Sequence, residues 1–410
     1  MIWGPPRLRL EPRPLELALR DPFDLDLAAA FQASVWLLSA CTVLLFVAAR
    51  GKMGLPSIPP IIYKSSLRFY LLYGLLALAS AAYSVSPLYT LFFAGKILVS
   101  VFAVGLLVKR ADMAATVPHF LKLFFFAQIF QWLLTVFTFL MNPELVGSEL
   151  TDIGYRLSGG LFEDYGTPAA LAGIYFLCEA LYLRRGLVRV IFMGLYGLTW
   201  IFVILSRTRS TILGAVCVLF CALVLHSSMR VRIMTVISGT LLLMAISLST
   251  FSNMIVSYGL RGQNAEALLS LTGRVHAFRF LMTEWQSAPW LGHGYAAGSR
   301  QLLMAFVDQT GLGIGAAHDA ASKVLTDLGL VGCMLLTFIL VAAWREVVRL
   351  LRSVKHRKDV RPLAVHVWCL LTFFTLISVV SSGIADAGFP FLIISASVAL
   401  ANNRLRHCPS

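Results

Sequence analysis

GIGAAHDAASKVLTDLGLVG, residues 313–332, joins a polar segment to an apolar one. The apolar part continues to residue 344, so the stretch 321–344 is long enough to cross the hydrocarbon core of a bilayer as a helix. His318 and Asp319 stand directly before this stretch. The sequence therefore predicts a membrane-spanning helix with two titratable residues at its entrance.

The composition indicates a membrane protein with many spans. Apolar residues make up 58% of the chain and charged residues 13%, and the mean hydropathy is +0.80, which excludes a soluble globular domain. The net charge of +14 does not indicate a nucleic-acid partner, because Lys and Arg fall in short clusters between apolar runs, as in cytoplasmic loops. The seven cysteines show no zinc-ligand spacing, and we expect neither a bound metal nor a cofactor.

Apolar runs of about 17 to 25 residues predict the membrane-spanning helices. The fold class is accordingly an all-α polytopic membrane protein with about 11–12 transmembrane helices. The runs lie near residues 28–49, 67–85, 88–108, 118–141, 166–183, 187–205, 210–226, 232–254, 321–344, 363–381 and 387–402.

Basic clusters assign the two sides of the membrane. They fall at alternate ends of the spans and are therefore predicted to be cytoplasmic. The clusters are Lys109-Arg110, Arg184 to Arg189, Arg230-Arg232, Arg345 to Arg361 and Arg404-Arg406. The loops 142–165 and 255–320 then lie on the outer face. Counting back places the N-terminus outside although its first twenty residues carry four arginines, so a further span before residue 67 is an alternative.

These assignments divide the chain into five parts. They are an N-terminal surface segment (1–27), the first part of the transmembrane bundle (28–254), a long outer loop (255–320), the last part of the bundle (321–402) and a cytoplasmic tail (403–410). The long outer loop contains the polar motifs, and we expect it to form amphipathic helices.

Two arginines stand where the positive-inside tendency disfavours them. In VILSRTRSTILGAV, residues 203–216, Arg207 and Arg209 separate two apolar runs at the predicted outer boundary of the membrane. One interpretation is a tight turn between helices whose arginines reach lipid headgroups. The other is an anion site, because a guanidinium is a fixed fork of donors suited to phosphate oxygens. Two residues apart on a helix, the arginines face different ways, so we expect one of them to enter the site.

A second polar stretch, SLTGRVHAFRFLMTEWQSAPWLGHGY, occupies residues 270–295 of the long outer loop. Its spacing predicts an amphipathic helix over residues 271–285, in or near the membrane interface. One side of this helix carries Val275, Phe278 and Met282. Arg274 and Arg279 either meet lipid phosphates there or take part in binding an anion.

A single histidine before a helix also has two interpretations. His318 is a capping or interfacial residue, and Asp319 is itself a suitable N-cap. Alternatively, a neutral imidazole beside an arginine-bound anion acts as a general base, since imidazole titrates near neutral pH.

Four stretches, taken in order, resemble the O-antigen ligase and polymerase superfamily, bacterial integral-membrane glycosyltransferases that move glycans off undecaprenyl-pyrophosphate. They are SGGLFEDYGTPAALAG at 158–173, TRSTILGA at 208–215, SLTGRVHAF followed by PWLGHGY within 270–295, and AHDAASKVLTDLGLVG at 317–332. The chain departs from the family pattern twice. Gly166-Thr167-Pro168 stands where relatives have Pro-Asn, and Asp319 stands where they have Asn.

The resemblance implies a GT-C-like fold and a metal-independent, inverting transfer at the periplasmic face of the inner membrane. His318 would be the general base, and Arg209 and Arg274 would hold the pyrophosphate. The remaining substrate-binding residues would be Arg207, Arg279, Asp319 and Arg156. The implied partners are the undecaprenyl-pyrophosphate-linked donor, a sugar acceptor and the lipid bilayer. We favour a repeat-unit polymerase of O-antigen or exopolysaccharide, with a ligase that transfers the finished chain to lipid A core as the alternative.

Two other classes of protein share some of these features. A polysaccharide flippase or transporter also has about a dozen spans, and Lys96 within FFAGKILVSV is the kind of intramembrane charge it uses. That class does not explain one long outer loop bearing the polar motifs. A metal-dependent transferase of the dolichol-mannose type needs carboxylates in its first outer loop, and SVSPLY at 84–89 has none.

Overall fold

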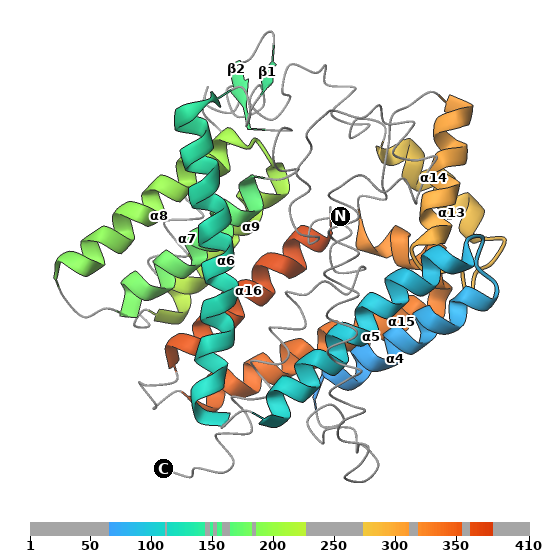
Figure 1. Ribbon diagram of the computed structural model, residues 1–410, viewed down its shortest axis with the longest axis horizontal. Helices are drawn as coiled ribbons and strands as arrows, with labels where there is room; N and C mark the ends of the chain where they lie inside the picture. Colours follow the sequence, from blue (N-terminus) through green and yellow to red (C-terminus); the bar gives the residue numbers. More distant parts are fainter. Residues whose placement is uncertain are drawn as a thin grey trace. The chain divides into compact units, whose positions relative to one another are not determined.

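The computed structural model describes residues 65–110, 113–143, 148–150, 154–157, 165–182, 186–226, 274–310, 319–354 and 361–379 (Figure 1). Helices dominate these ranges, as the fold class requires. The predicted spans near 28–49, 232–254 and 387–402, together with the segments 1–27 and 403–410, lie outside the described residues.

The structure confirms an all-α polytopic membrane protein. Four described helices are long and apolar enough to cross a membrane by length and composition, and three shorter apolar helices accompany them. The long ones are Leu121–Met141 within α6 (Met113–Met141), α8 (Leu187–Leu205), α15 (Ala320–Ser353) and α16 (Arg361–Ser378). The shorter ones fall in α4 (Leu67–Ala79) with the 3-10 turn η1 (Ser80–Ala82), in α5 (Pro87–Arg110) and in α9 (Arg209–His226).

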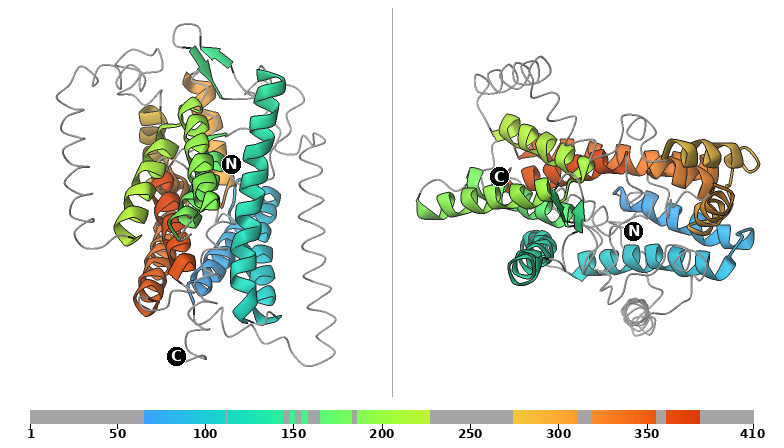
Figure 2. Two further views of the ribbon diagram at one scale, coloured as in Figure 1. Left: turned by 90° about the vertical axis from the view of Figure 1, so that its left-hand side faces the viewer. Right: turned by 90° about the horizontal axis from the view of Figure 1, so that it is seen from above.

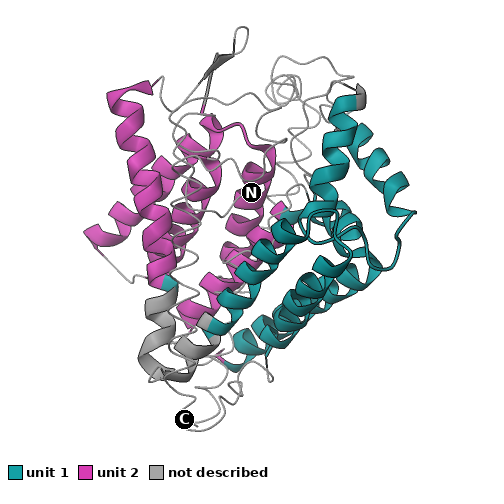
Figure 3. Ribbon diagram, turned by 45° about the vertical axis from the view of Figure 1, so that its right-hand side comes forward, with its two compact units in different colours: residues 1–121, 273–353, 378–410 teal, residues 122–272, 354–377 magenta. Residues whose placement is uncertain are grey.

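The chain forms two compact units, coloured separately in Figure 3. The described part of unit 1 contains α4, η1, α5, α15 and two helices of the long outer loop, α13 (Arg274–Trp285) and α14 (Ala297–Thr310). The described part of unit 2 contains α6 from Lys122 onward, α8, α9, most of α16, α7 (Gly166–Tyr182) and the strands β1 (Ser148–Leu150) and β2 (Gly154–Arg156).

In unit 1, α4 lies beside α5 and also packs against α15 (Figure 2). The backbone N–H and the hydroxyl of Ser66 donate to the two carboxylate oxygens of Glu346, at 2.7 and 3.0 Å. This contact satisfies orphan donors at the start of α4. In the middle of α4, the buried ring of Tyr73 meets Tyr295 edge-on, with 6.0 Å between ring centroids. The two contacts join α4 to the rest of unit 1 at its start and at its middle.

The helix α15 is not continuous. Gly329 has φ 63° and ψ −161°, a backbone state that is essentially restricted to glycine. A Cβ at this position would overlap the carbonyl group of Trp290. The part of α15 after Gly329 is roughly 36 Å long and can span the hydrocarbon core without the part before it.

In unit 2, α7 packs against both α8 and α9. A Cβ on Gly173 would lie 2.7 Å from the Thr199 hydroxyl, so a glycine is needed for α7 and α8 to lie this close. The antiparallel hairpin β1–β2 pairs Ser148 with Arg156. Directly after it, the N–H of the buried Leu157 donates to the carbonyl of Leu205 at 3.0 Å. The hairpin is thereby tied to the last residue of α8.

Candidate active site

A short stretch of the predicted outer loop 255–320 docks onto the break in α15. We call residues 289–295, PWLGHGY, the docking loop. The N–H groups of His293 and Gly294 donate to the carbonyls of Thr326 and Asp327, at 2.8 and 2.9 Å. In return, the N–H groups of Leu330 and Val331 donate to backbone carbonyls of the docking loop. Loop and broken helix therefore satisfy each other's backbone groups.

The returning bonds run to Pro289 and Trp290. The Leu330 N–H lies 2.9 Å from the Pro289 carbonyl oxygen, and the Val331 N–H lies 3.2 Å from that of Trp290. A Cβ on Gly292, which has φ 66°, would lie 2.6 Å from the carbonyl carbon of Asp327. Gly292 of the docking loop and Gly329 of α15 are thus explained by one close backbone crossing.

The carboxylate of Asp327 binds two further backbone N–H groups beside this crossing. Its Oδ2 accepts from the Ala296 N–H at 3.0 Å, and its Oδ1 accepts from the Ser299 N–H at 2.7 Å. Asp327 is 2% exposed, so both oxygens are used inside the protein. Since α14 begins at Ala297, the carboxylate caps the N-terminus of α14 from within α15.

The turn between α4 and α5 holds the other side of the docking loop. The hydroxyl of Tyr83 donates to the Leu291 carbonyl at 2.8 Å. At Tyr295, the N–H donates to the Ser80 hydroxyl and the carbonyl accepts from Thr90, at 3.0 and 2.9 Å. The docking loop is therefore fixed between the α4–α5 turn and the α15 break, both within unit 1.

The two helices α13 and α14 pack on each other through a small apolar cluster. Its buried members are Ala277, Leu281, Leu303 and Phe306. The expected helix is present, beginning at Arg274, but the face that packs is not the one with Phe278, which is 45% exposed. Arg279 is also exposed.

Arg274 and Arg279 occupy different positions along α13. Arg274 is its first residue, where the chain enters the helix, and Arg279 lies one and a half turns later. Sequence reasoning did not select Arg300, in the first turn of α14. Its Nη1 donates to the Tyr89 hydroxyl at 2.9 Å, and its guanidinium lies 5.1 Å from the centroid of the Tyr89 ring. A half-buried arginine therefore also lies in this outer segment.

In unit 2, a tight turn carries Arg207 and Arg209. Arg207 has φ 49°, the left-handed state that ends many helices, and its N–H donates to the Ile204 carbonyl at 3.0 Å. Arg209 is the first residue of α9. The Nη1 of Arg207 and the Nε of Arg209 are buried. Both side chains thus keep part of their guanidinium group inside the protein.

The same turn receives the other predicted outer loop. The Leu157–Leu205 bond brings the backbone next to Arg156 to the end of α8. A Cβ on Gly166 would overlap the Ser206 side chain. The hydroxyl of Thr167, which is 3% exposed, lies 3.4 Å from that of Thr211 in the first turn of α9. The Gly-Thr that replaces the family's Pro-Asn is therefore buried against the arginine turn.

The entrance of α15 carries Asp319. Its Oδ1 accepts from the Ser322 N–H at 2.7 Å, and its Oδ2 accepts from the Ser322 hydroxyl. Asp319 is thus the N-cap of α15, one of the roles that its position before an apolar run predicts. His318 lies outside the described residues.

The structure places the predicted residues in two groups, each within its own unit. Unit 2 brings the backbone beside Arg156 to the turn of Arg207 and Arg209, and unit 1 holds Arg274, Arg279 and Asp319. Sequence reasoning overlooked Asp327. The signal was present, because a carboxylate inside an apolar span is rare unless it has a specific partner.

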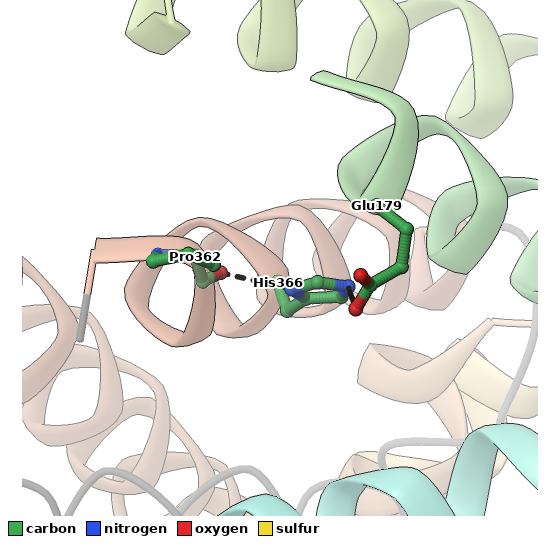
Figure 4. Close-up of polar contacts among 3 residues, drawn as sticks. All are labelled: Glu179, Pro362 and His366. Atoms are coloured by element: carbon green, nitrogen blue, oxygen red, sulfur yellow. Dashed lines mark hydrogen bonds and ion pairs between the residues drawn. The ribbon is translucent and has the colours of Figure 1, made fainter. Parts of the chain in front are cut away.

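Unit 2 also contains a titratable pair, the buried His366 and the half-buried Glu179. The Nδ1–H of His366 donates to the Pro362 carbonyl at 2.8 Å, and its Nε2 lies 3.8 Å from Oε1 of Glu179; Figure 4 shows both neighbours. Glu179 is near the end of α7 opposite Gly166, roughly 20 Å along the helix. The pair therefore ties α7 to α16 at a distance from the arginine turn.

One known protein family matches the part of the chain that contains most of these residues. A family model described as O-antigen ligase matches residues 194–337, from within α8 to within α15. This range contains the arginine turn, α13, the docking loop and the start of α15. No curated protein matches the chain. The match confirms the resemblance to the O-antigen ligase and polymerase superfamily.

Proposed function

Because residues 194–337 match a family model described as O-antigen ligase, we propose that the protein transfers a glycan from undecaprenyl-pyrophosphate to an acceptor sugar hydroxyl. Members of this family are glycosyltransferase-like enzymes. The reaction takes place on the periplasmic face of the inner membrane, and its product is the polymer of O-antigen or exopolysaccharide repeat units. The observation that carries the proposal is the family match, which includes Arg209, Arg274 and His318.

The chemistry requires cations at the leaving group. Displacing pyrophosphate from an anomeric carbon concentrates negative charge on the departing oxygens, and preorganised donors stabilise that charge. Arg209 and Arg274 each begin a helix, α9 and α13, so their backbones are fixed by regular structure on one side. The partly buried guanidinium of Arg209 supports its role, because a desolvated donor acts more strongly on an anion.

The acceptor requires a base. His318 takes the proton of the acceptor hydroxyl as that oxygen attacks the anomeric carbon from the side opposite the pyrophosphate, so the configuration inverts. The Asp319 carboxylate is occupied by Ser322. Its part in the proposal is therefore to fix the first turn of α15, and with it the backbone that precedes the helix.

The test uses the full-length protein in liposomes with a lipid-linked donor. His318→Ala should lower the transfer rate by about 10²–10⁴-fold and leave donor binding intact, because the arginines hold the donor. His276→Ala, an exposed histidine of α13, is the matched control and should transfer normally. Wild-type transfer should also fall as pH drops through the titration of the histidine, since an imidazolium cannot accept a proton. Normal transfer by His318→Ala would refute the assignment.

The acceptor decides between polymerase and ligase. A polymerase extends a second lipid-linked repeat unit, so the products form a ladder of increasing length. A ligase instead transfers a finished chain to lipid A core. Offering both acceptors in one liposome assay and separating the products by size distinguishes the two, and transfer to lipid A core alone would replace the polymerase proposal with the ligase one.

A further inference from the structure

Asp327 holds three separate pieces of unit 1 together. Its carboxylate bonds the N–H groups of Ala296 and Ser299, and its own carbonyl accepts from Gly294 of the docking loop. The residue lies two positions before the break at Gly329. One side chain and one carbonyl therefore join the docking loop, the start of α14 and the outer part of α15.

The outer part of α15 runs from the Asp319 cap to the break. Asp319 fixes its first turn and Asp327 fixes its last, so this short stretch is held at both ends. The proposed base directly precedes it. Any movement of the stretch relative to the outer loop would move the backbone next to the base.

The proposed donor-binding residues of unit 1, Arg274 and Arg279, belong to the long outer loop. The helices α13 and α14 both pack against α15 and against each other. The rings of Phe280 and Phe306, 5.4 Å apart at their centroids, belong to the α13–α14 contact. Since Asp327 caps α14, the position of α13 and of Arg274 at its start depends on this carboxylate.

We propose that Asp327 is a positioning residue for the glycosyl transfer: its carboxylate holds α14 and the docking loop on α15, and so sets Arg274 relative to the base-bearing entrance of α15. The inference rests on the proposed function. Only a carboxylate fits the role, because both N–H groups need an acceptor. An asparagine offers one acceptor oxygen and turns its NH₂ group toward the other N–H.

The test compares three single variants and one double variant of the full-length protein in liposomes, at a temperature well below each variant's melting temperature. Asp327→Asn should lower kcat about 10- to 100-fold and leave the KM for the donor within about twofold, because a displacement near 1 Å costs rate and not binding. Asp308→Asn, an exposed position of α14, is the control and should match wild type.

The third variant removes the contact between Asp327 and Ser299 by changing Ser299. Ser299→Pro removes the N–H that Asp327 binds but keeps the carboxylate, and proline is tolerated in the first turn of a helix. Gly298 precedes it and lacks the Cβ that would clash with the proline ring. Ser299→Pro should lower kcat in the same way, and the double variant should be no slower than Asp327→Asn alone, because both substitutions disrupt the contact between Asp327 and Ser299. This variant also keeps the test decisive if Asp327→Asn does not fold.

The results of this test distinguish failure of the positioning role from failure of the proposed function. Normal kcat in a folded Asp327→Asn or Ser299→Pro variant, or a raised donor KM with normal kcat, overturns the positioning role and leaves the proposed function standing. If the losses of kcat in the two single variants add up in the double variant, the positioning role is overturned as well. Wild-type protein that transfers no glycan overturns the proposed function, and with it this inference.

Discussion

At the scale of single residues, backbone state separates the two arginines of the turn. Arg207 has the left-handed backbone that ends α8, whereas Arg209 is the first helical residue of α9. A left-handed backbone costs about 1–2 kcal/mol in a residue with a side chain. Arg207 therefore lies outside both helices, whereas Arg209 belongs to α9.

Arg209→Lys and Arg274→Lys should each abolish transfer in the liposome assay while the protein still inserts into the membrane. An ammonium group cannot reproduce the two parallel bonds that a guanidinium makes to phosphate oxygens. Arg207→Lys is the comparison and should be milder. If Arg207→Lys were inactive and Arg209→Lys nearly normal, the pyrophosphate contact would belong to Arg207.

Gly329→Ala should destabilise the protein by about 2–4 kcal/mol, because alanine does not adopt this backbone state and its Cβ would overlap Trp290. Gly197→Ala provides the control. A Cβ there meets nothing within 4 Å, and in the interior of α8 the change should be neutral or stabilising by up to about 1 kcal/mol. Equilibrium unfolding in mixed detergent measures both. Equal stability of the two variants would show that α15 can run through position 329 unbroken.

The sequence predicts candidate residues better than it predicts contacts. Arg209, Arg274 and Asp319 stand out because charge is rare in an apolar chain, and Arg209 and Asp319 also lie at predicted boundaries. The structure places each of them at a helix start. Asp327 is also a charge within an apolar run, but its partners are backbone N–H groups about thirty positions earlier, which no local pattern reveals.

At the scale of elements, the start of α15 depends on its cap. Asp319→Asn should keep the cap within a few tenths of a kcal/mol, because asparagine also accepts a bond from the third N–H of a helix. Asp319→Ala should cost about 1 kcal/mol. Transfer should follow the same order, with Asp319→Asn closer to wild type. Equal activity of the two variants would show that the Asp319 cap does not affect the transfer reaction.

Helix bounds also show where sequence reasoning works. The apolar run at 187–205 is found as α8 with the same ends, because hydropathy marks a lipid-facing helix directly. The run at 321–344 belongs to a longer helix, Ala320–Ser353, and its break was not predicted. Leu328, Leu330 and Val331 keep the hydropathy high across Gly329, so only the distant docking loop explains the break. The bounds of α14 and the β1–β2 hairpin were not predicted either, because both lie in polar loops.

At the scale of the whole molecule, the division of the chain at residues 254 and 321 stays a prediction. The fold class is confirmed over the described ranges. The side of the membrane on which each loop lies stays a prediction from the basic clusters.

Glycan transfer should survive exhaustive treatment with EDTA. The two outer loops contain no close set of His, Cys or carboxylate side chains with the spacing of metal ligands, so the arginines have to neutralise the pyrophosphate. The rate in liposomes before and after chelation measures this. Loss of transfer that magnesium or manganese restores would contradict a metal-free mechanism.

The docking of the loop on the broken helix has a consequence for how the protein is made. Carbonyl and N–H groups left open at a break are costly in an apolar environment until something satisfies them. Residues 289–295 precede α15 in the chain, so synthesis delivers the loop before the helix that needs it. The groups that satisfy the break are therefore already part of the chain when α15 is synthesised.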